Sequence, residues 1–148
     1  MKPLISLCAV LFCISAFPIQ DNAVKDELKR LQGHWVRVSC HADGQLTEDG
    51  DRPPDKQVKL EITSNRFASM PFVIDVTKTP YHIDLQDVGP KGKQFTLPGI
   101  YELKGDVLKI CLPFPFEGKY DQIHKRPTEF VSKKGENHVV EVYRRETK

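Results

Sequence analysis

The segment YELKGDVLKICL, residues 101–112, contains two alternating runs of apolar and polar residues separated by Lys104-Gly105-Asp106. Alternation of this kind gives a strand one apolar and one polar face, which is typical of an antiparallel sheet with water on one side. A short glycine-containing turn joins two such strands. The segment therefore predicts a β-hairpin.

The same period of two recurs along most of the chain. Alternating runs cover residues 36–41, 58–63, 81–86 and 140–143 besides the two strands of the hairpin, and turn residues separate them. The pattern predicts an all-β domain of roughly eight antiparallel strands, arranged as a barrel or a sandwich. Three segments, 45–56, 87–94 and 113–127, are predicted to be long loops.

One short helix is expected before the strands. In residues 23–32, Val24, Leu28 and Leu31 recur at spacings of four and three, and Gly33 follows as a stop signal. A single helix in this place fits a barrel that is plugged at one end.

The N-terminal segment has a different character. Lys2 precedes a run from Leu4 to Phe17 that is apolar except for two serines, and polar residues follow at 20–22. The run is shorter than the roughly 20 residues that a membrane-spanning helix needs. A basic start, a short apolar core and a polar break are typical of a secretory signal peptide. We expect residues 1–20 to be a signal peptide, cleaved between residues 16 and 23, and residues 24–148 to be one exported domain, periplasmic or extracellular, without a stable membrane span.

Two cysteines, Cys40 and Cys111, remain once the signal peptide is removed. In an oxidising compartment they could form one disulfide, provided that their Cα atoms lie within about 7 Å. The sequence does not give the strand order, so a disulfide and two buried free thiols both remain open, with the free thiols favoured.

The charge of the chain disfavours nucleic acid as a partner. The formal net charge is +2, and cleavage before Asp21 removes Lys2 and lowers it to +1. Binding to nucleic acid needs a concentrated basic face, whereas here acidic residues interleave with the basic pairs.

No metal site, cofactor or catalytic site is predicted. The histidines at 34, 41, 82, 124 and 138 show no spacing typical of metal ligands, and they are expected on the surface. The acidic segment around Asp49-Gly50-Asp51 lacks the ligand pattern of a calcium loop and is expected to be solvated. The serines lie in no nucleophile motif, and the apolar neighbours of Cys111 would raise its thiol pKa rather than activate it.

The segment Leu31-Gln32-Gly33-His34-Trp35 places Gly-x-Trp after the short helix and at the start of the first strand. It resembles the N-terminal signature of lipocalins and related calycin barrels. This resemblance implies that Trp35 packs across the barrel floor, with an arginine from near the last strand on its ring. Arg144 is the candidate, because it shares a face with Val140 and Val142.

A longer stretch, residues 98–112 with KRPTEF at 125–130, resembles a family of secreted, lipocalin-like proteins of unknown function that is abundant in planctomycete bacteria. The resemblance runs from about Leu28 to Arg144 and departs between Phe67 and Thr79. There SMPFVID at 69–75 replaces a Gly-containing hairpin and a Gly-x-Tyr strand. It implies a lipocalin-like barrel and export, but no activity and no catalytic residues.

An eight-stranded barrel can be filled by side chains or can hold one small ligand. We therefore rank a module that binds a small apolar ligand first, a protein-interaction or inhibitor module with a filled core second, and an enzyme last. A cavity of several hundred cubic ångströms would favour the first. The predicted ligand-binding residues are Leu60, Ile62, Ile83, Leu85 and Leu103 in the barrel, and Phe114, Phe116 and Tyr120 in the loop at its mouth.

Overall fold

The structure is a computed structural model that describes residues 19–114 and 125–147. Residues 1–18, which make up most of the predicted signal peptide, lie outside the described residues. Among the helices that are described, none combines the length and the apolar character needed to cross a membrane.

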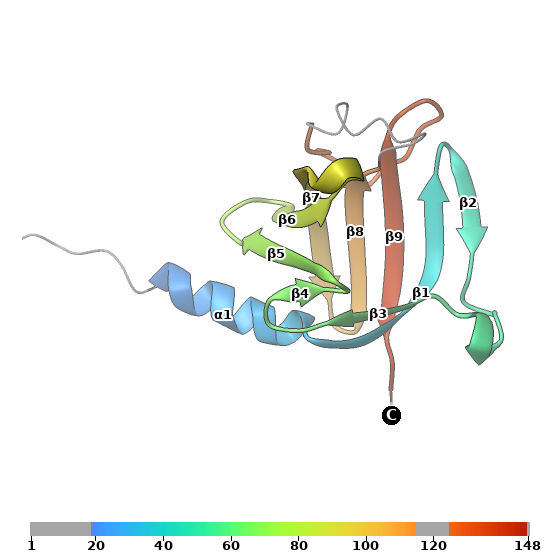
Figure 1. The fold of residues 1–148 in the computed structure, drawn as a ribbon. Helices are drawn as coiled ribbons and strands as arrows, with labels where there is room; N and C mark the ends of the chain where they lie inside the picture. The colour runs from blue at the N-terminus through green and yellow to red at the C-terminus, as the bar shows by residue number, and fades with distance from the viewer. Residues whose placement is uncertain (1–18, 115–124, 148) are drawn as a thin grey trace, which may run out of the picture.

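The described part of the chain contains one α-helix and nine strands (Figure 1). They are α1 (Ile19–Leu31), β1 (Gly33–Ala42), β2 (Gln45–Glu48), β3 (Lys59–Ile62), β4 (Arg66–Phe67), β5 (Met70–Asp75), β6 (Tyr81–Val88), β7 (Gln94–Lys104), β8 (Val107–Pro113) and β9 (His138–Arg145). Two short 3-10 helices, Pro54–Lys56 and Pro90–Gly92, lie in loops.

Eight of these strands close into an antiparallel barrel. Each strand from β3 to β8 pairs with the next along the chain, and β1 closes the ring by pairing with both β3 and β9. The extra strand is β2, which pairs with residues 39–42 of β1, beyond the residues 33–36 that pair with β3. The predicted all-β barrel of roughly eight antiparallel strands after a short helix is confirmed.

The helix α1 covers one end of the barrel (Figure 1). It starts at Ile19 rather than at residue 23, where the sequence pattern places its start. Leu31 is 1% exposed and packs in the same core as Trp35, and Leu28 packs against that core. Arg30 pairs with the buried Glu27 at 2.6 Å. The last turns of α1 therefore act as a plug.

The half of the barrel next to α1 is filled by apolar side chains. Trp35 has no exposed surface, and its indole Nε1 donates a hydrogen bond to the Leu31 carbonyl at 2.9 Å. Large residues of four other strands pack in the same cluster: Leu60, Ile62, Ile83, Leu85, Tyr101, Leu103, Leu108 and Ile110. This half is a close-packed hydrophobic core.

Arg145, rather than Arg144, lies on the ring of Trp35. The guanidinium carbon is 4.2 Å from the ring centroid, while Arg144 is exposed on the outer face of β9. Gly33 makes room for this arrangement: its φ is +131°, and a Cβ atom there would lie 2.9 Å from Nη1 of Arg145. The Gly-x-Trp pattern thus permits a cation–π contact at the closed end of the barrel.

The face of β9 that points inward is the opposite of the one inferred from its valines. Glu141 and Tyr143 line the interior, whereas Val140 is buried on the outer face. There Val140 packs with Ile100 and Cys111 beneath Phe130. The apolar residues of β9 thus serve two separate clusters, one on each side of the sheet.

A β-bulge at Val38 changes the inward face of β1. Arg37 pairs with Tyr143, but the next inward pair is Cys40 with Glu141, three residues further along β1 and two along β9. The Val38 carbonyl accepts hydrogen bonds from the amides of Asp49 (2.8 Å) and Gly50 (3.1 Å). The bulge therefore ties the segment after β2 to the wall of the barrel.

The structure contains no disulfide between Cys40 and Cys111, since both thiols are free. The alternative of a disulfide is therefore wrong, and the favoured alternative of two free thiols holds. Cys40 points into the barrel and Cys111 into the outer cluster, and β9 lies between their strands. Two strand spacings are roughly 9.6 Å, which exceeds the reach of a disulfide.

The predicted loops are shorter than expected. The segment 45–56 contains β2 and a 3-10 helix, and β6 extends to Val88. Most of the loop predicted at 113–127, including Phe116 and Tyr120, lies outside the described residues.

Candidate functional site

A cavity of about 610 Å³ occupies the half of the barrel away from α1. It lies between the end of β1, the ends of β6 and β8, and the starts of β5, β7 and β9. These strand ends are remote from Trp35, so the cavity occupies the mouth opposite the plugged end.

One wall of the cavity is apolar. Phe67 and Met70 come from the β4–β5 hairpin, Phe95 and Leu97 from β7, and Leu112 from β8. Phe67 is held by edge-to-face packing on Phe72, with their ring centroids 6.4 Å apart. A surface of this kind favours the burial of an apolar molecule.

The opposite wall, formed by β1 and β9, carries a polar cluster. Arg37 donates from Nε to Asp49 and from Nη1 to Glu141, each at 2.6 Å. The Tyr143 hydroxyl donates to the other oxygen of Glu141 at 2.9 Å. We call Arg37, Asp49, Glu141 and Tyr143 the polar cluster.

Asp49 reaches this cluster from the segment that follows β2. Its side chain has no exposed surface, and Arg52 lies 2.7 Å from the oxygen that Arg37 does not bind. The backbone amide of Asp49 donates to the Val38 carbonyl, and this hydrogen bond holds the Asp49 carboxylate next to the Arg37 guanidinium. The expectation of a solvated acidic loop is therefore wrong for Asp49, although Glu48, Asp51 and Asp55 are exposed.

The environment of the cluster favours fixed protonation states. Burial by itself would lower the pKa of Arg37, but its hydrogen bonds to Glu141 and Asp49 outweigh burial and raise the pKa above the ordinary value. Burial and the charge of Glu141 raise the pKa of Tyr143. Arg37 is thus a permanent cation and Tyr143 a neutral hydroxyl at physiological pH.

Cys40 faces the cavity beside Glu141, its partner in the strand pairing. Burial raises the pKa of the Cys40 thiol, and the charge of Glu141 acts in the same direction. A thiol of this kind is a poor nucleophile at neutral pH. No histidine or serine is among the described residues that line the cavity.

Few of the predicted ligand-binding residues meet in the cavity. Leu60 and Phe114 line it, and Phe114 is 50% exposed at the mouth. Ile62, Ile83, Leu85 and Leu103 are instead buried in the filled half.

Sequence reasoning missed the whole polar cluster. One signal could have found Arg37, because it lies two residues after Trp35 and period two places both on the same face of β1. Glu141 and Tyr143 then follow as its neighbours across β9. Asp49 carries no such signal, since its contact depends on the path of a loop.

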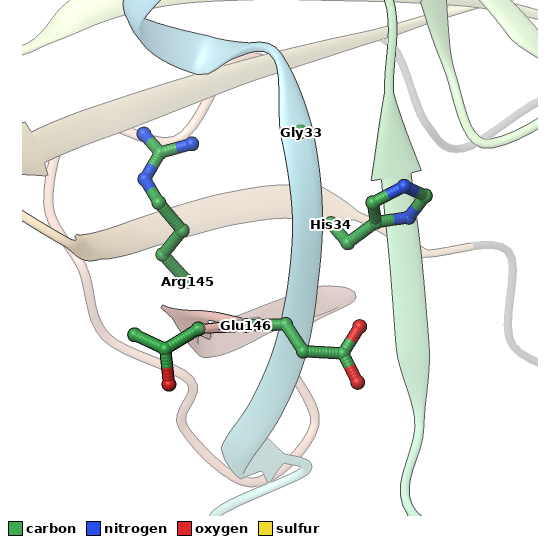
Figure 2. Close-up of a pocket in the computed structure, with 5 residues that line it drawn as sticks. Gly33, His34, Arg145 and Glu146 are labelled. Atoms are coloured by element: carbon green, nitrogen blue, oxygen red, sulfur yellow. The ribbon is translucent and has the colours of Figure 1, made fainter.

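A second, smaller hollow of about 320 Å³ lies outside the barrel, beside Gly33, His34, Arg145, Glu146 and Thr147 (Figure 2). Figure 2 shows Arg145 and His34 on opposite sides of the strand, so these side chains do not converge. Arg145 also donates from Nε to Asp106, from Nη1 to the Gln32 carbonyl and from Nη2 to the Arg30 carbonyl. We regard this hollow as the weaker candidate.

Within residues 19–114 and 125–147, no group of three or more histidine, cysteine or acidic side chains is placed to hold a metal ion. Comparison of the chain with protein-family models, curated proteins and solved structures gave no match. The candidate site therefore rests on its geometry: a cavity with one apolar wall and one paired, charged wall.

Proposed function

We propose that this protein binds a small, mainly apolar ligand in the cavity at the mouth of its barrel. The volume of about 610 Å³ carries this proposal, because pockets for small molecules usually measure about 300–1,000 Å³ and are lined mainly by apolar side chains. The polar cluster supplies the few polar groups that such pockets use to orient a ligand.

We further propose that the protein is an exported, lipocalin-like domain, as the resemblance of residues 28–144 and the signal-like N-terminus imply. The alternative, a protein-interaction or inhibitor module with a filled core, has less support. Only the half of the barrel around Trp35 is filled, and the other half is hollow.

The uncharged fluorescent probe N-phenyl-1-naphthylamine tests ligand binding directly. Its fluorescence rises in apolar surroundings, so titration should give saturable binding with one site per chain. Ala42→Trp places an indole in the cavity, which Ala42 lines, and should weaken probe binding at least tenfold.

Val73→Trp is the matched control, because Val73 is 62% exposed on the outer face of β5. This variant should bind the probe as the unmodified protein does. Equal binding by both variants would place the probe elsewhere and count against the cavity. Absence of saturable binding would refute the proposed function.

The native thiols provide an independent readout. N-ethylmaleimide should label Cys40 in the cavity slowly, because its thiol pKa is raised, whereas Cys111, with no exposed surface, should stay unmodified in the folded protein. Saturating probe should slow the labelling of Cys40, measured by peptide mass mapping. Labelling of Cys40 at an unchanged rate would contradict occupancy of the cavity.

A further inference from the structure

The two walls of the cavity offer a ligand different contacts, and the polar cluster decides which head group fits. Arg37, Glu141 and Tyr143 lie on the adjacent strands β1 and β9. The apolar residues Phe67, Met70 and Leu97 lie on β4, β5 and β7. A bound molecule must therefore turn an apolar body toward one wall and a polar group toward the other.

The hydrogen bonds within the cluster leave one unused donor group. Arg37 uses Nε and Nη1 for Asp49 and Glu141, and its Nη2 donates to no residue that the structure describes. Both oxygens of Glu141 already accept a hydrogen bond, one from Arg37 and one from Tyr143. Oδ2 of Asp49 accepts from Arg37, whereas Oδ1 lies 2.7 Å from Arg52, makes no hydrogen bond to a described residue and is buried beyond the reach of a ligand. The unmet capacity that a ligand could reach on this wall is thus that of a donor, and it calls for an acceptor on the ligand.

The charges of the cluster disfavour an ionised head group. The single charge of Arg37 already faces two carboxylates, Asp49 and Glu141, both 2.6 Å away. A carboxylate on the ligand would approach these two anions together with the guanidinium. An ammonium would have to approach Arg37 itself. The charged side chains that line the cavity, Arg37, Lys59, Asp87 and Glu141, sum to zero.

We propose that the ligand is a neutral amphiphile, an apolar chain or ring system with one uncharged acceptor oxygen such as an ester or ketone carbonyl. Nη2 of Arg37 donates to that oxygen, and the apolar body lies against Phe67, Met70 and Leu97. This inference rests on the ligand-binding function proposed above and specifies its chemical class.

Competition with N-phenyl-1-naphthylamine on the unmodified protein tests the head group without any substitution. Four competitors share a main chain of ten atoms: methyl octanoate, decane, nonanoate and nonylamine. At pH 7.4 the acid and the amine are ionised, whereas the ester and the alkane are neutral. Methyl octanoate should displace the probe at about tenfold lower concentration than each of the others, which is a typical gain for a hydrogen bond to a charged donor.

The outcomes separate the two proposals. Displacement by nonanoate or nonylamine at the concentration required for the ester, or below it, overturns the neutral head group. Equal displacement by decane and methyl octanoate overturns the acceptor, while ligand binding itself stands. Failure of the probe to bind removes both proposals.

Two variants assign the preference to Arg37. Arg37→Lys keeps the charge but lacks a second terminal nitrogen, so the tenfold preference for the ester over decane should shrink to less than threefold. Arg144→Lys is the matched control, because it makes the same substitution at an exposed arginine on the outer face of β9 and leaves Nη2 of Arg37 in place. It should keep the preference within about twofold. An unchanged preference in Arg37→Lys, with the fold verified by thermal melting, would exclude Nη2 as the donor.

Discussion

Around Trp35 the interior of the barrel is filled, whereas around Arg37, two residues further along β1, it opens into a cavity. Both levels are built from the same strands. At the level of Trp35, large apolar side chains meet from several strands and α1 covers the end. At the level of Arg37 the interior carries paired charges, and the small side chains of Cys40 and Ala42 face inward beyond them.

This difference shows that the strand number alone does not decide whether a small barrel is full or hollow. Eight strands permit either state. The size and charge of the side chains that point inward at each height of the barrel determine which state occurs there. A charged cluster whose members pair with one another cannot collapse into an apolar core without losing those partners. Substitutions in each half should therefore have separate and different effects.

The largest effect is expected from Trp35→Ala in the filled half. Removing a fully buried indole should lower the free energy of unfolding by about 3–5 kcal/mol, because the packed neighbours cannot close the space. Urea denaturation measures this loss. Val73→Ala, at an exposed position of β5, is the control and should change stability by less than about 1 kcal/mol. A loss below about 1 kcal/mol for Trp35→Ala would contradict a closed, packed end.

Alkaline pH should destabilise both halves. Burial raises the pKa of Cys111 from 9.0 to about 11 and raises the pKa values of Tyr101 and Tyr143 above their ordinary 10.0. Each pKa is higher in the folded than in the unfolded state, so the stability it contributes is complete below the unfolded value and is lost as the pH rises. Between pH 8 and 11 the free energy of unfolding should fall by about 3–5 kcal/mol, since each of the three groups contributes about 1–2 kcal/mol over this range.

Urea denaturation at pH 8, 9.5 and 11 measures this dependence. Tyr101→Phe removes the contribution of the filled half to this pH dependence, and Tyr143→Phe removes the contribution of the hollow half. Each variant should therefore show a shallower decline than the unmodified protein. Stability that stays constant up to pH 11 would mean that these groups are hydrated.

A smaller loss is expected from Asp49→Asn in the hollow half. The change removes the negative charge behind Arg37, whose side chain is 18% exposed. Since Arg37 keeps Glu141 and some contact with water, we expect a loss of about 2 kcal/mol, less than for a fully buried ion pair. Asp51→Asn, on an exposed neighbour in the same segment, should change stability by no more than about 0.5 kcal/mol. Equal effects of the two substitutions would show that the contact of Asp49 is dispensable.

The smallest effects compare the two tyrosines directly at pH 7. The Tyr101 hydroxyl is buried without a hydrogen-bond partner among the described residues, so Tyr101→Phe should leave stability unchanged or raise it slightly. Tyr143 donates to Glu141, and Tyr143→Phe should cost about 1 kcal/mol. The reverse order would mean that the polar cluster does not stabilise its half of the barrel.

Much of the fold follows from local patterns in the sequence. The alternation in residues 101–112 and 81–86 identifies strands β6 to β8 and their hairpin, because each strand has one face in the core. The closure of the ring does not follow from these patterns, since it depends on β1 pairing with both β3 and β9. In the sequence, only two resemblances pointed to a closed barrel: that of Gly33-x-Trp35 to lipocalins, and that of residues 98–112 and 125–130 to a lipocalin-like family.

The inward face of β9 could not be read from its residues. Val139, Val140 and Val142 place apolar side chains on both faces of β9, so the hydrophobic pattern does not indicate which face points into the barrel. The outer cluster with Phe130 decides it, and that contact joins residues distant in the sequence. The same reversal explains why Arg145, and not Arg144, lies on Trp35.

The candidate site was harder to predict than the fold, because charged residues in alternating strands are normally expected in water. Arg37 and Glu141 are exceptions, because both point into the barrel, and the charge of each is stabilised there only by its ion pair with the other. A single-residue pattern cannot contain this information.

The bulge at Val38 has a consequence for how β1 tolerates changes in length. In an ordinary strand, deletion of one residue inverts every side chain that follows it. In β1 the bulge already holds one residue more than β9, so a chain shortened by Val38 would keep Cys40 and Ala42 on their present face, in register with Glu141 and Val139. Such a deletion would cost the carbonyl that receives the amides of Asp49 and Gly50. The middle of this strand is therefore a point where the chain can lose a residue while the inner surface of the barrel keeps its layout.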